Sequence, residues 1–265
     1  MFQKVLAGFG SGGAKVDARL LDRAVRPGGV LHGEVLLLGG QVDQEVDALG
    51  VTLLTRVETG DGGKTADLPV QTVRLADHET VRAGSQLRVP FEVHLPWETP
   101  VTTVFGKHLT GMAVGLQTNL DLAGAVVDPQ DVDAVAVEPL PAQHRVLDAV
   151  SRLGFTFREA GMERDRLDGV DQQLPFLQEI AFGPSPAFER VFDRVVVTFL
   201  ARPADVQVVL EVTKRVRVAR GGGLGNRGQA FLGSFTVAHA AVGANWEQRL
   251  EGWLRQVAAP RGIFD

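Results

Sequence analysis

The first part of the chain alternates apolar and polar residues, and the alternation breaks at each cluster of glycine or proline. Lys15, Asp17 and Arg19 are separated by single apolar residues. This period of two is typical of a β-strand with one wet face and one buried face. Clusters of turn residues separate the successive segments. The pattern predicts strands at about 14–21, 30–38, 45–58, 67–76, 86–95, 111–121 and 131–138.

The second half of the chain repeats this pattern after a break at Pro139 and Pro141. Short valine-rich segments separated by turn residues are typical of β-sandwiches. We therefore predict a mainly β protein of two consecutive β-sandwich domains, with residues 1–139 in the first and residues 140–265 in the second. The strands predicted for the second domain are Phe155–Glu159, Leu174–Phe182, Arg194–Ala201, Asp205–Val218 and Phe231–Val237.

Apolar residues at helical spacing occur in three segments. They predict a short amphipathic helix over the first nine residues and a second helix over residues 143–153, which Gly154 ends. The longest helical pattern begins at Trp246. Asn245 and Gln248 have the form of a capping pair there, and Pro260 follows the end of the pattern.

The apolar stripe of this last helix includes Trp246, Leu250 and Trp253. Three interpretations remain open. The stripe packs on the chain's own sandwich, which the pattern favours, or it forms a homodimer contact, or it binds a partner or a membrane surface. We treat Trp246, Leu250 and Trp253 as candidate partner contacts.

Composition narrows the classes of function. The length of 265 residues suits two domains of ordinary size. A net charge of −5 disfavours a nucleic-acid binder, because binding to phosphates requires clustered positive charge. No apolar run is long enough to span a membrane, and the start of the chain is a poor signal peptide. The absence of cysteine fits a reducing compartment, and we expect a cytoplasmic protein.

We find no set of residues that predicts a reaction. Gly8–Gly13 and Gly223–Gly228 match the letters of a dinucleotide fingerprint, but neither stands where a strand turns into a helix. The six histidines lack metal-ligand spacing, and the serines include no nucleophile elbow. We therefore expect no enzymatic activity, no cofactor and no metal site.

The acidic residues Asp121, Asp128, Asp131 and Asp133 are close together in the sequence. They are exposed acids of a linker, or part of a polar latch between the two domains, or ligands of a divalent cation. The spacing lacks the alternating oxygen ligands and the glycine of a calcium loop. We favour the interpretation as exposed acids.

Several motifs along both predicted domains are similar to one family. They are Lys15-Val-Asp-Ala-Arg-Leu, Pro27-Gly28-Gly29, Leu95-Pro96-Trp97-Glu98-Thr99-Pro100, Leu116-Gln-Thr-Asn-Leu-Asp121 and Leu174-Pro175-Phe176 with Gln178-Glu179. With these motifs the chain resembles the bacterial sporulation-control proteins with an arrestin-like fold. The resemblance implies two arrestin-like β-sandwiches joined by a short linker, and a role as a regulatory adaptor. It implies no catalytic residues.

In the wider arrestin-like family the first strand lies beside a groove for a partner segment. The resemblance therefore raises the hypothesis that Lys15 and Arg19 contact an acidic or phosphorylated peptide. The alternative, which the sequence favours, is two solvated charges on either side of Asp17.

The sequence as a whole predicts a non-enzymatic adaptor or scaffold that binds protein partners through the edges and surfaces of its sandwiches. Two alternatives remain open. One is a module that holds a lipid or a small molecule inside a sandwich, and the other is a scaffold that assembles with itself.

Overall fold

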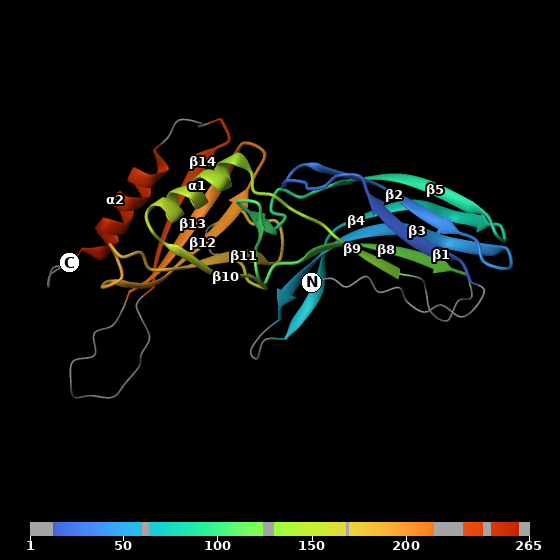
Figure 1. The fold of residues 1–265 in the computed structure, drawn as a ribbon, viewed down its shortest axis with the longest axis horizontal. Helices are drawn as coiled ribbons and strands as arrows, with labels where there is room; N and C mark the ends of the chain where they lie inside the picture. Colours follow the sequence, from blue (N-terminus) through green and yellow to red (C-terminus); the bar gives the residue numbers. More distant parts are fainter. Residues whose placement is uncertain are drawn as a thin grey trace. The chain divides into compact units, whose positions relative to one another are not determined.

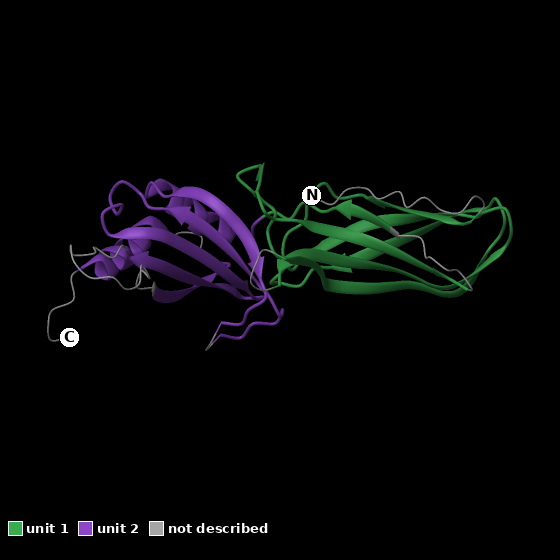
Figure 2. Ribbon diagram, turned by 90° about the horizontal axis from the view of Figure 1, so that it is seen from below, with its two compact units in different colours: residues 1–138 green, residues 139–265 purple. Residues whose placement is uncertain are grey.

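The computed structural model describes residues 13–59, 64–123, 130–167, 170–214, 230–240 and 245–259. The chain forms two compact units, residues 1–138 and residues 139–265 (Figure 2). The helix predicted over the first nine residues lies outside the described residues.

Unit 1 is built from two antiparallel sheets (Figure 1). The first has the strand order β1-β2-β5, with β1 at Lys15–Leu20, β2 at Val30–Leu38 and β5 at Gln86–His94. The second has the order β4-β3-β8-β9, and its strands are β3 (Gln44–Glu58), β4 (Thr65–Val81), β8 (Val114–Leu122) and β9 (Gln130–Ala134). A short hairpin joins β6 (Thr103–Val104) to β7 (Lys107–His108).

The core of unit 1 follows from the alternation in the sequence. Burial alternates along β1 and β2, so every second side chain faces inward. Gly33 of β2 pairs with Phe91 of β5, and a Cβ at position 33 would lie 2.2 Å from the Phe91 ring. The glycine therefore leaves room for the ring to lie across the strand. Other buried side chains of this unit are Leu31, Val35, Leu37, Leu49, Leu53, Leu116 and Leu120.

Unit 2 contains an antiparallel sheet of five strands in the order β10-β11-β12-β13-β14. Its central strand β12 is buried continuously from Val195 to Ala201, which indicates that both of its faces are covered there. The strands are β10 (Thr156–Glu163), β11 (Leu177–Gly183), β12 (Phe192–Ala201), β13 (Asp205–Lys214) and β14 (Ala230–Ala238).

Two helices, α1 at Pro141–Arg152 and α2 at Trp246–Ala258, lie over one face of this sheet (Figure 1). The side chain of Asn245 accepts the N–H of Gln248 at 3.1 Å, which confirms the predicted cap of α2. Gly154 follows α1 with a φ of 86°, so the predicted glycine stop is also confirmed. The buried residues of both helices include Val146, Leu147, Val150, Trp246, Leu250 and Leu254.

Candidate functional site

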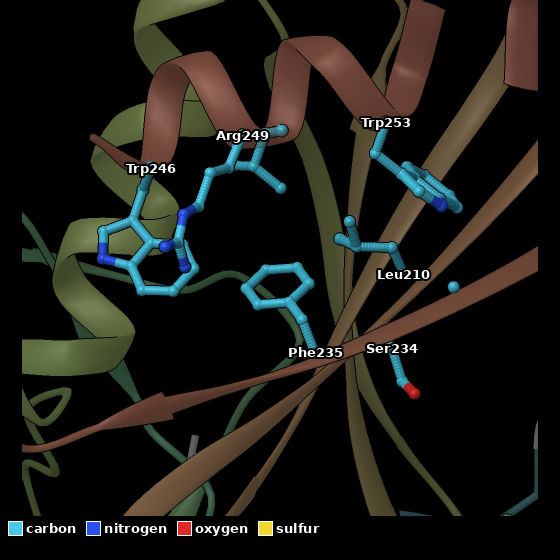
Figure 3. A pocket seen from close by; sticks show the side chains of 8 residues that line it. Leu210, Ser234, Phe235, Trp246, Arg249 and Trp253 are labelled. Carbon is cyan, nitrogen blue, oxygen red and sulfur yellow. The ribbon is translucent and has the colours of Figure 1, made fainter. Parts of the chain in front are cut away.

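Trp253 of α2, labelled in Figure 3, points toward the sheet. Its ring packs across the backbone of Gly233 in β14. A Cβ at position 233 would lie 2.3 Å from Cζ2 of the indole ring, so any side chain there would force the ring or the strand to move. Because side chains alternate along a strand, Phe235 points to the same face as position 233. Its ring stacks on Trp246, with the ring centroids 5.3 Å apart. The two tryptophans of α2 therefore lie over two alternate positions of β14.

A pocket of about 180 Å³ lies between α2 and the strands β13 and β14. Of the described residues that line it, Arg249 alone is charged. The guanidinium carbon of Arg249 lies 5.0 Å from the ring centroid of Trp246, in a cation–π contact. We call this space the aromatic pocket, and its lining residues are Leu210, Gly233, Ser234, Phe235, Trp246, Arg249, Leu250 and Trp253.

A second hollow, of about 380 Å³, lies against the other face of β13 and β14. In Figure 3 the Ser234 side chain points away from α2, as alternation requires. Leu232 points the same way and is 69% exposed. Among the described residues that line this hollow, the charged one is Arg166. We call this space the outer groove, and its lining residues are Arg166, Leu167, Val170, Gln207, Val209, Leu232, Gly233 and Ser234.

β14 is an edge strand between these two hollows. It pairs with β13 along its whole length, from Asp205 opposite Ala238 to Thr213 opposite Ala230. Among the described strands, none pairs with its other side. An edge of this kind presents backbone N–H and C=O groups to any chain that can approach it.

The structure places the predicted contacts of the last helix at different depths. Trp246 and Leu250 are buried in unit 2, whereas Trp253 is half-buried beside the edge of the sheet. Packing of the stripe on the chain's own sheet, the favoured interpretation, describes all three residues, because Trp253 also packs across Gly233. Trp253 remains accessible as a candidate contact.

Lys15 and Arg19 lie on the outer face of β1, where both are exposed. Nη1 of Arg19 is 3.8 Å from Oε1 of Glu34, and Nη1 of Arg88 is 3.5 Å from the same oxygen. Arg19 therefore takes part in a small surface network of charges across the sheet. Exposed pairs of this kind stabilise a fold by less than about 1 kcal/mol.

The predicted acidic cluster separates into different environments. Asp131 of β9 is only 6% exposed, and its Oδ2 accepts the backbone N–H of Ala18 in β1 at 3.4 Å. The interpretation as exposed acids is therefore wrong for Asp131, because β9 lies next to the edge of β1. Asp121 is exposed, and Asp128 lies outside the described residues. Among the described residues, no group of His, Cys, Asp and Glu side chains could hold a metal ion.

Glu179 of β11 belongs to a charged group that the sequence did not reveal. Burial, and secondly repulsion from Glu163, raise the pKa of Glu179 to about 7, while Arg194 opposes the rise. Nη2 of Arg194 is 3.6 Å from the Glu179 carboxylate and 3.6 Å from that of Glu159. These residues come from three strands, so only the register of the sheet brings them together.

The two glycine motifs, Gly8–Gly13 and Gly223–Gly228, include residues outside the described part of the chain. In the part that is described, no helix is long and apolar enough to cross a membrane.

Sequence reasoning missed the residues around β14, namely Arg166, Leu232 and Gly233. A glycine inside an apolar strand is a signal of close approach by another group, and Gly233 carries it. Leu232 carries a second signal, because it places an apolar residue on the polar face of the strand. Arg166 offers no such signal, since the fold alone brings it to the outer groove.

Comparisons with known proteins agree with one another. The family model described as SpoOM protein matches residues 2–216. A curated relative, the sporulation-control protein spo0M of Bacillus subtilis (strain 168), is 32% identical over 223 residues, which is 83% of this chain and 83% of the relative. The crystal structure of Spo0M from Bacillus subtilis matches with a TM-score of 0.77 at 26% identity, covering 94% of this chain and 100% of that chain.

The structural match confirms the mainly β, arrestin-like fold class. The family match covers most of the sequence, including both compact units in part. The chain belongs to the SpoOM protein family.

Proposed function

We propose that this protein is a regulatory adaptor that binds other proteins through the edges and surfaces of its sheets and catalyses no reaction. Support comes from the Bacillus subtilis relative, whose name states a role in sporulation control. Control of a process by binding requires an accessible and specific surface, and it requires no set of reacting groups.

The observation that carries the proposal is the exposure of Leu232 on the edge strand β14. Leu232 is a large apolar side chain that is 69% exposed, and among the described strands none pairs with the outer side of β14. An exposed apolar residue beside an unpaired edge is typical of an interaction surface. Trp253 extends this apolar surface on the α2 side. The proposed contacts of unit 1 are Lys15 and Arg19, whose charges lie on the outer face of β1.

We extend the proposal to the organisation and location of the chain. The two arrestin-like domains are assigned to residues 1–139 and 140–265, next to the boundary between the compact units. The proposed compartment is the cytoplasm, because a chain without cysteine fits reducing conditions.

The lipid or small-molecule module is the weaker alternative. The aromatic pocket of about 180 Å³ is smaller than the roughly 300–1,000 Å³ of ordinary ligand sites. The outer groove of about 380 Å³ lies at the lower end of that range, but its lining residue Leu232 is 69% exposed, so the groove is open to solvent and does not enclose a lipid chain.

Capture of the tagged full chain from crosslinked native cells tests the proposal, with the tag alone as control. Protein partners in near-stoichiometric amounts are the expected result. Recovery of the protein alone, with a mass in solution that rises with concentration, would instead establish the self-assembling scaffold. A small molecule retained in native mass spectrometry, without protein partners, would establish the ligand-binding module.

A further inference from the structure

We propose that the free edge of β14 binds an extended segment of a partner protein as an added antiparallel or parallel strand, with apolar side chains entering the aromatic pocket and acidic side chains meeting Arg166. The inference rests on the proposed adaptor function and names the surface and the chemistry of the partner. It follows from the composition of the edge, the hollows on its two faces, and their charge.

The first observation is the composition of β14. Its sequence, Ala-Phe-Leu-Gly-Ser-Phe-Thr-Val-Ala, contains no charged residue and no proline, and its register with β13 shows no bulge. Proteins usually protect exposed sheet edges with charged residues, chiefly lysine, or with proline or bulges. The edge strands of unit 1, which are β1, β4, β5 and β9, all carry charged residues. The strand β14 itself therefore carries none of these three protective features.

The second observation is that both faces of β14 are hollowed at the same point. The aromatic pocket and the outer groove share Gly233 and Ser234 in their linings. A strand added beside β14 sends alternate side chains to opposite faces of the sheet. Main-chain hydrogen bonds then supply affinity, and the two hollows select the side chains.

The third observation is the charge of the two hollows. Among their described lining residues the charged ones are Arg249 on the α2 face and Arg166 on the other. Nη1 of Arg166 lies 3.4 Å from the Gln172 carbonyl, which holds the guanidinium beside the outer groove. Glu211 of β13 lies opposite Leu232 in the register and would repel an acidic partner residue there. Acidic partner residues are therefore expected beside Arg166 and not beside Leu232.

The same charges argue against a second copy as the occupant. In two copies paired through β14, the added strand would offer no acidic residue to the arginines of the other copy, and Glu211 of β13 already lies opposite Leu232 of its own chain. A partner segment that alternates apolar and acidic residues complements both the hollows and their charge.

The probe is a displayed library of nine-residue peptides with apolar residues at alternate positions and random residues between them, selected against the full chain. The enriched peptides are expected to carry acidic residues at the random positions.

The affinity of the enriched peptides is expected to fall roughly tenfold for the variant Leu232→Glu. The matched control is Leu21→Glu, because Leu21 is 59% exposed in unit 1. Arg166→Glu should also weaken binding, whereas Arg164→Glu, an exposed neighbour outside the lining, should not.

Backbone methylation of an enriched peptide separates strand addition from simple filling of a pocket. Methylation of one alternate set of amides should abolish binding, and methylation of the other set should leave it intact, because only one set faces β14. The inference is overturned if no peptide is enriched, if Leu232→Glu binds as well as Leu21→Glu, or if both methylated peptides behave alike. Cellular partners that still bind Leu232→Glu would refute strand addition and leave the adaptor standing. An absence of partners for the wild-type chain would refute the adaptor itself.

Discussion

The indole ring of Trp253 occupies the space that a side chain at Gly233 would fill, and this contact fixes α2 on β14. The helix can approach the strand closely only because position 233 has no Cβ. The aromatic pocket beside this contact owes its shape to the same close approach, since α2 forms one of its walls.

Gly233→Ala is expected to destabilise unit 2 by about 1–3 kcal/mol, because the new methyl group overlaps the Trp253 ring. Urea denaturation followed by tryptophan fluorescence measures the change. Gly252→Ala is the matched control within α2. Nothing lies within 4 Å of a Cβ at position 252, and alanine in place of a helical glycine should stabilise by about 0.5–1 kcal/mol. Equal effects of the two substitutions would contradict the proposed packing.

Asp131→Ala is expected to destabilise unit 1 by about 1–3 kcal/mol, because it leaves the buried N–H of Ala18 without its acceptor. Asp131→Asn keeps an acceptor oxygen and should cost less. Chemical denaturation followed by far-ultraviolet circular dichroism measures both variants. Asp121→Ala, at an exposed position, should change stability by less than about 0.5 kcal/mol. An Asp131→Ala protein as stable as the Asp121→Ala control would refute the role of this carboxylate.

Glu179 should make stability depend on pH. Folding raises the pKa of Glu179 from 4.5 to about 7, so between these values the folded state retains a proton that the unfolded state releases. The stability that this group contributes is complete below pH 4.5 and is lost as pH rises through about 7. Glu179→Gln cannot ionise, and its stability relative to the wild type should therefore rise by about 1 kcal/mol from about pH 5 to about pH 8, after allowance for solvent screening.

Urea denaturation of the wild type and of Glu179→Gln at both pH values measures this difference. The exposed substitution Glu189→Gln serves as the control and should show no such change. If the stability of Glu179→Gln relative to the wild type is the same at both pH values, the carboxyl of Glu179 does not carry the effect.

Calcium, magnesium and EDTA should each leave the melting temperature unchanged, because a cation that bound the folded state would raise it. The described residues offer no group of side chains with which to hold a metal ion. Differential scanning calorimetry of the full chain measures the effect. A rise on adding either cation, reversed by EDTA, would restore the metal interpretation of the acidic residues at 121–133.

Local signals in the sequence predicted local structure correctly. The cap at Asn245 and the stop at Gly154 depend on a few neighbouring residues, and the structure confirms both. Strand ends were less accurate, since β4 runs from 65 to 81 where alternation indicated 67–76. The hairpin at 103–108 was missed because strands of two residues carry no period.

The candidate site depends on relationships that no local pattern contains. Leu232 belongs to the candidate site because β14 is the last described strand of its sheet. Arg166 belongs to it because its loop lies against the sheet face opposite α2. Asp131 was interpreted as exposed because its partner Ala18 is 113 residues away in the sequence, and no local pattern indicates that the two residues are in contact. Strand order and register supply this information, and they follow from the whole fold.

The most direct test of the central claim is quantitative capture of partners from native cells by the wild-type chain, by Leu232→Glu and by Leu21→Glu, after each variant is shown to be folded. Leu21→Glu is expected to retain the partners of the wild type, whereas Leu232→Glu is expected to lose the one bound at β14. Equal recovery of every partner by the two variants would contradict it.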